Sequence, residues 1–147
     1  MVRGIKFEVP NTWYPVIYLI LKAINIDEFF WYLASEDVMG DHRDYFDKYK
    51  YAGTEFKKVI QEKDCYAISI NLQAYLNEND IVEIHSYGDY QESQCKLLLL
   101  IDDNSYIMLY AKEQEILEAI HNDVELNGFE NIKYITDEND KRNLNWL

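Results

Sequence analysis

The chain has 147 residues, 48% of them apolar and 15% aromatic, which excludes an intrinsically disordered protein. This is the length of one ordinary domain, and we expect a single domain over residues 1–147, since no repeat or linker-like segment divides it. The net charge of −13 disfavours binding to nucleic-acid phosphates and anionic lipids, and the longest apolar run is too short to span a membrane.

The acidic residues are concentrated in the second half of the chain. Between Asp64 and Lys133 the only basic residues are Lys96 and Lys112. The same stretch holds fourteen acidic residues, namely Asp64, Glu78, Asp80, Glu83, Asp89, Glu92, Asp102, Asp103, Glu113, Glu115, Glu118, Asp123, Glu125 and Glu130. Such a surface attracts a basic protein partner, or it serves only to keep the chain soluble, and the sequence leaves both interpretations open.

The first third of the chain predicts a strand, a helix and a second strand. Val2–Val9 alternates apolar and polar residues, which is typical of a strand. Trp13–Ile24 has apolar residues at helical spacing, with Pro15 acceptable in the first turn. The bulky run Phe29–Ala34 predicts a buried strand, whereas Glu36–Gly53 mixes polar and aromatic residues and predicts no single structure.

The middle of the chain predicts shorter elements. Thr54–Glu62 has the pattern of a short helix, for which Thr54 is the expected N-cap. Tyr66–Leu72 alternates over seven residues and predicts a strand. Ile81–His85 predicts a second, shorter strand, and Gly88–Ser93 a helical turn.

A hairpin, a helix and a last strand complete the expected order. The strands are Lys96–Ile101 and Tyr106–Tyr110, and the turn residues between them favour a hairpin. Because Leu97–Ile101 contains no polar residue, its strand should be central and covered on both faces. Glu113–Leu126 predicts the clearest helix, and Phe129–Ile135 a final strand. The order predicts an α+β fold: a mainly antiparallel (mixed) sheet packed by two longer helices and one short helix.

The sequence contains no recognised catalytic or cofactor-binding motif. Its five glycines do not match the spacing of a phosphate-binding loop, and there is no G-x-S-x-G or H-E-x-x-H motif. We therefore expect no cofactor. Cys65 and Cys95 lack metal-ligand spacing, and we expect both to be reduced, buried thiols in a cytoplasmic protein.

Two small groups of polar residues are candidate sites. Glu83 and His85 would share one strand face, where the carboxylate and the imidazole could act as an acid–base pair. Asp41, His42 and Asp44 lie close together in the sequence and offer ligands for a hard cation. The simpler interpretations are an exposed pair in the first case and a solvated loop in the second.

Both ends of the chain resemble one family. Residues 3–11, RGIKFEVPN, are similar to the opening of its members, and residues 127–140, NGFENIKYITDEND, together with Arg142, are similar to their close. The family comprises small single-domain proteins of spore-forming Gram-positive bacteria, described only as a domain of unknown function. The resemblance is weakest at residues 36–53. It implies a bacterial cytosolic protein and transfers no catalytic or ligand-binding residue.

Two functional hypotheses follow. The first is a non-enzymatic domain whose acidic, tyrosine-rich surface binds a basic protein partner, for example as an inhibitor or immunity protein. The alternative is a small-molecule-binding domain or minor enzyme, with a pocket lined by Phe29–Tyr32 and with Glu83 and His85 as its polar groups. The sequence does not indicate an oligomeric state.

Overall fold

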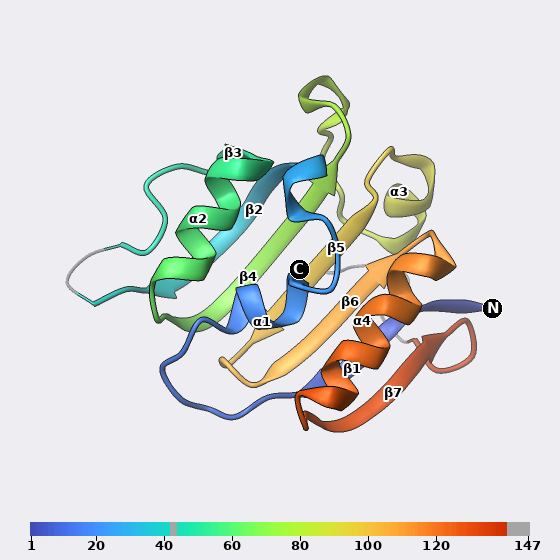
Figure 1. The fold of residues 1–147 in the computed structure, drawn as a ribbon. Helices are drawn as coiled ribbons and strands as arrows, with labels where there is room; N and C mark the ends of the chain where they lie inside the picture. The colour runs from blue at the N-terminus through green and yellow to red at the C-terminus, as the bar shows by residue number, and fades with distance from the viewer. Residues whose placement is uncertain (42–43, 141–147) are drawn as a thin grey trace.

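The computed structural model describes residues 1–41 and 44–140. Within these ranges seven strands form one sheet in the order β3-β2-β4-β5-β6-β1-β7 (Figure 1). Every neighbouring pair is antiparallel, so the α+β class is confirmed and the sheet is antiparallel throughout. The strands are β1 (Val2–Glu8), β2 (Phe30–Met39), β3 (Lys50–Ala52), β4 (Tyr66–Tyr75), β5 (Leu97–Asp102), β6 (Tyr106–Ala111) and β7 (Glu130–Thr136).

Helices cover the sheet unequally. One face carries α1, α2 and α4, whose buried side chains form the larger core with alternate residues of the strands (Figure 1). The other face carries α3 and the chain around it, which enclose a smaller, tyrosine-rich core. The helical elements are α1 (Val16–Leu21), η1 (Ile26–Glu28), α2 (Gly53–Glu62), η2 (Glu78–Asp80), α3 (Tyr87–Glu92) and α4 (Gln114–Leu126).

Strand β5 separates the two cores. Leu97 and Leu99 belong to the larger core, whereas Leu98 and Leu100 belong to the smaller one. The prediction of a central strand covered on both faces is thereby confirmed. Cys65 and Cys95 are free and fully buried, and burial raises the pKa of the Cys65 thiol to about 11 and that of Cys95 to about 12.

The predicted helix Trp13–Ile24 is shorter than its pattern indicates. The α-helix covers only Val16–Leu21, and Pro15 precedes it as the N-cap residue. A residue before proline avoids the helical conformation, and Tyr14 instead forms an isolated antiparallel bridge with Cys65. Trp13 therefore lies in a loop, while the helix itself is buried. Consequently α2 and α4 are the two longer helices.

Two further local predictions are wrong. Ile81–His85 is not a strand but an irregular segment, in which Ile84 packs into the smaller core. The apolar residues there hold this segment against the smaller core, and the segment does not pair with a neighbouring strand. Helix α2 begins at Gly53 directly after β3, and no side-chain cap is formed, so Thr54 is not its N-cap.

The segment without a predicted structure contains the end of β2 and all of β3. Strand β2 continues to Met39, beyond its buried aromatic part, and pairs with β4 as far as Tyr66. Its residues 34–37 and Met39 are exposed and only Val38 is buried in this part, so apolar alternation does not reveal the strand. Gly88–Ser93 was predicted correctly: α3 spans Tyr87–Glu92. None of the helices in the described ranges has the length and apolar character needed to cross a membrane.

Candidate functional site: an acidic cavity at the end of the sheet

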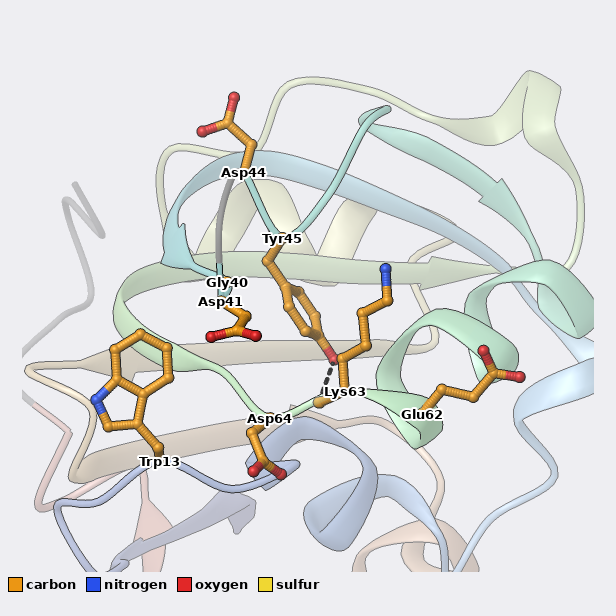
Figure 2. A pocket seen from close by; sticks show the side chains of 8 residues that line it. All are labelled: Trp13, Gly40, Asp41, Asp44, Tyr45, Glu62, Lys63 and Asp64. Carbon is orange, nitrogen blue, oxygen red and sulfur yellow. Dashed lines mark hydrogen bonds between the residues drawn. The ribbon is translucent and has the colours of Figure 1, made fainter.

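A cavity of about 620 Å³ lies where β2 ends and β4 begins. The chain next to these two strand ends forms part of its wall, and the loop before α1, which carries Trp13, forms another part. This volume falls within the range of about 300–1,000 Å³ that is typical of ligand-binding pockets. The residues that line it are Trp13, Gly40, Asp41, Asp44, Tyr45, Glu62, Lys63 and Asp64 (Figure 2).

The lining is strongly acidic. Four of its described residues are carboxylates and one, Lys63, is a cation. Helix α2 ends at Glu62, so the negative end of its dipole adds to the negative potential of the cavity. All four carboxylate residues are exposed, so they bear their charge without the cost of burying it. The cavity is therefore suited to a positively charged group.

Tyr45 forms the inner wall of the cavity. Its ring is buried and packs edge-on against Phe46, with the ring centroids 4.8 Å apart. Its hydroxyl group lies 3.0 Å from the carbonyl oxygen of Val59 and 3.1 Å from that of Lys63, to which it donates (Figure 2). Burial raises the pKa of Tyr45, so the hydroxyl remains protonated at neutral pH. Tyr45 thus fastens the end of α2 and does not act as a base.

Trp13 is the exposed aromatic residue of the cavity wall. Its side chain is 46% exposed, and its ring centroid lies 5.8 Å from that of Tyr66, at an interplanar angle of 42°. Met39, which is paired with Tyr66 across β2 and β4, is exposed to a similar degree. These three side chains form an aromatic and apolar platform, which we call the Trp13 platform.

Asn104 holds the Trp13 loop in place. It is fully buried in the turn between β5 and β6, with a φ of 54°. Its side chain donates to the carbonyl oxygen of Thr12, at 3.1 Å, and accepts from the backbone N–H of Ala67, at 2.8 Å. On the other side of Trp13, the backbone N–H of Cys65 donates to the carbonyl oxygen of Tyr14. Trp13 is thus exposed on a loop that is fixed at both ends.

The structure brings together only part of the predicted site residues. Asp41 and Asp44 line the cavity, and an isolated bridge between Met39 and Asp44 brings the chain back at this point. His42 lies outside the described residues. Within residues 1–41 and 44–140, no three His, Cys, Asp or Glu side chains are arranged to hold one metal ion.

Glu83 and His85 contact each other, but at the surface. The His85 Nε2 atom lies 3.4 Å from the Glu83 carboxylate, and both side chains are mostly exposed. They precede α3 on the face of the smaller core. Phe29 and Trp31, by contrast, pack in the larger core on the opposite face. Tyr32, from the same predicted lining, packs against the smaller core, so the predicted aromatic lining is divided between the two faces of the sheet.

The sequence pattern did not identify Trp13, Tyr45 or Lys63 as members of a site. Trp13 fits the apolar stripe of a helix, which conceals its position in the loop. The one local signal was Pro15, because the residues before a proline favour an extended chain. Tyr45 lies in the segment for which the sequence predicted no structure, so its contact with α2 could not be inferred.

Comparison with known proteins places the chain among proteins without an assigned activity. Residues 2–145 match a family model described as "Protein of unknown function (DUF2691)". The chain is also similar to the uncharacterized protein YncE of Bacillus subtilis (strain 168), with 30% identity over 148 residues, which cover 97% of each chain. No solved structure is significantly similar to the chain.

Proposed function

Because the chain belongs to the DUF2691 family, whose description names no activity, we propose a function from the geometry: a non-enzymatic domain that binds a basic protein partner. The binding region is the acidic cavity together with the Trp13 platform. The observation that carries this proposal is the cavity itself, where a rim of carboxylates adjoins exposed aromatic side chains. Charge complementarity of this kind gives a binding site its specificity and speeds association.

The chemistry of the lining supports binding in preference to catalysis. Tyr45, the one buried polar side chain among the described residues of the cavity wall, already uses its hydroxyl hydrogen in bonding to the backbone. The carboxylates around it lie at an open rim, where water competes for every proton transfer. Such an arrangement attracts a cation but does not hold a substrate bond between an acid and a base.

In its concrete form, the proposal describes a cytoplasmic protein that captures a basic protein, such as an enzyme or toxin that it inhibits. A bound arginine or lysine of that partner would be neutralised by the cavity, while apolar parts of the partner would cover the Trp13 platform. Aromatic residues at the centre of an interface, surrounded by a polar rim, are the usual source of binding energy.

The size of the cavity favours one other candidate, a small cationic metabolite such as a polyamine. A volume of about 620 Å³ can hold a molecule of that kind, and the rim charges fit its amines. A thermal-shift screen separates the two candidates. A polyamine that raises the melting temperature at micromolar concentration would favour the metabolite, whereas a basic partner that survives competition by polyamine would favour the protein.

Affinity capture from host lysate at low and at high salt, read by mass spectrometry, tests the proposal. We expect a basic protein to be captured at low salt and lost at high salt, because screening weakens exposed charge pairs. The variant Asp41→Asn/Asp44→Asn/Asp64→Asn should lose this protein. The control Glu78→Gln/Glu92→Gln/Glu118→Gln removes three exposed charges elsewhere and should retain it.

Equal loss of the partner from both variants would mean that only the overall charge matters, and the cavity would then have no special role. Capture of no basic protein under any of these conditions would contradict the proposal itself. Where a basic protein is captured, repeating the experiment with that purified protein gives its dissociation constant for each variant.

A further inference from the structure

Lysine and arginine are the two side chains that a basic partner could place at the cavity, and the Trp13 platform with its neighbouring carboxylates does not suit them equally. Figure 2 shows the indole ring of Trp13 beside Asp41 and Asp64, whereas the side chain of Glu62 points away from the space between Trp13 and Tyr45. A cation that enters beside Trp13 therefore comes close to an aromatic ring and two carboxylates.

The chain itself contains an arginine in such surroundings. The guanidinium carbon of Arg3 lies 3.9 Å from the centre of the Tyr87 ring. Its Nε atom donates to Asp137 at 2.8 Å, and one of its terminal nitrogens donates to Asp140 at 3.2 Å. One arginine thus uses an aromatic face and two carboxylates at the same time. Trp13, Asp41 and Asp64 present the same three components at the cavity.

From this correspondence we propose that the cavity receives an arginine side chain of the basic partner, and that arginine is preferred to lysine. The guanidinium plane lies on the Trp13 indole while its N–H groups donate to Asp41 and Asp64. This inference rests on the proposed function, since it names the residue by which the partner is held.

Three physical differences between the two side chains favour arginine. The guanidinium group is planar, so it stacks on an aromatic ring, whereas an ammonium group makes only a point contact. Its five donors can reach two carboxylates together. It is also more weakly hydrated than an ammonium group, so it loses less on entering a cavity. Tryptophan is the aromatic residue that attracts cations most strongly.

The cavity is well prepared for such a ligand. Trp13 is fixed from both sides by Asn104 and by the bridge from Tyr14 to Cys65, so little order has to be gained on binding. The end of α2 adds negative potential on the side opposite Trp13. The cavity volume also leaves room for part of the partner's main chain beside the arginine.

Three short peptides test the proposal: Ac-Gly-Gly-Arg-Gly-Gly-amide, the same peptide with lysine, and the same peptide with citrulline, which keeps the arginine shape without its charge. Binding is followed in ¹H–¹⁵N NMR spectra through the indole N–H signal of Trp13, assigned by its loss in Trp13→Leu. We expect the arginine peptide to shift this signal, with an affinity about tenfold above that of the lysine peptide, and citrulline to leave it unchanged.

Two variants support the assignment. Trp13→Leu should lower the affinity for the arginine peptide about tenfold. Binding to this variant is followed through the backbone signals of residues 41, 44 and 64. Tyr49→Leu removes an aromatic residue that is 65% exposed, away from the cavity lining, and should bind as the wild type does. Because Trp13 lies outside both cores, its replacement should leave the folded spectrum intact.

The outcomes separate this inference from the function on which it rests. Equal binding of lysine and arginine peptides, or unchanged arginine binding in Trp13→Leu, would overturn the preference for arginine. The capture experiment would still stand in that case. If neither peptide binds while the Asp41/Asp44/Asp64 variant still loses the basic partner, the partner uses the rim charges but places no arginine in the cavity, and the inference is wrong.

Discussion

Asn104 has two separable roles in the turn between β5 and β6. Its positive φ is a conformation that asparagine and glycine tolerate best, and its side chain bonds Ala67 and the Trp13 loop. Asn104→Gly keeps the backbone conformation and removes the side-chain bonds, so we expect a loss of about 1–3 kcal/mol in the free energy of unfolding. Asn104→Ala should cost about 1–2 kcal/mol more, because alanine is strained at this φ.

Urea denaturation of the three proteins measures both differences. If Asn104→Gly unfolds at the wild-type urea concentration, the side-chain bonds contribute nothing to stability. A weaker arginine-peptide affinity in a still folded Asn104→Gly protein would show that the loop must be fixed for Trp13 to bind.

Helix α2 approaches η1 so closely at one point that only glycine fits. A Cβ atom at Gly53 would lie 2.5 Å from the carbonyl oxygen of Asp27 and 2.6 Å from that of Ile26. Both atoms belong to the backbone, so the helix itself would have to move. We expect Gly53→Ala to lower the free energy of unfolding by about 1–3 kcal/mol and to disturb the cavity at the far end of α2.

Gly88 provides the matched control for this substitution. It also lies near the start of a helix, α3, but the nearest atom to its added Cβ would be the Ser86 hydroxyl oxygen, at 3.7 Å. Gly88→Ala should therefore stabilise the protein by about 0.5–1 kcal/mol, through the better helix propensity of alanine. Thermal unfolding followed by circular dichroism would show both signs, and destabilisation by both substitutions would refute the steric explanation.

The sequence predicts helices and strands well where a single residue pattern dominates. The hairpin of β5 and β6 and helix α4 follow from an apolar run, a turn and a helical stripe. The prediction fails where the pattern depends on distant partners. Tyr14 is extended because it pairs with Cys65, and the end of β2 is a strand because β4 lies beside it. Asp41 and Asp44 were identified by charge alone, but their association with Trp13 depends on these long-range contacts.

Arg3 joins the two ends of the chain. Its side chain binds Asp137 and Asp140. These two residues lie in the segment 127–140 and Arg3 lies in the segment 3–11, the two segments by which the sequence resembles its family. The Asp140 carboxylate is almost entirely buried and also accepts from the Tyr110 hydroxyl. We expect Arg3→Gln to reduce the free energy of unfolding by about 3–5 kcal/mol, because it removes the guanidinium charge that is bonded to this buried carboxylate.

The control for this prediction is Lys48→Gln. Lys48 forms an ion pair of 2.6 Å with Glu55, but both side chains are about half exposed. An exposed pair contributes at most about 1 kcal/mol, so this variant should unfold close to the wild type. Comparable losses in the two variants, measured by urea denaturation, would mean that burial does not distinguish the two ion pairs.

The position of β1 in the sheet has a consequence for the synthesis of the protein. Its two neighbours are β6 and β7, both from the last third of the chain, so the first strand to leave the ribosome is among the last to find its partners (Figure 1). Until residues 106–136 have emerged, Ile5 and Phe7 have no sheet in which to be buried. A nascent chain that stalls before β6 therefore presents an unpaired apolar strand to chaperones, and folding of this domain is completed only after residues 130–136 have been synthesised.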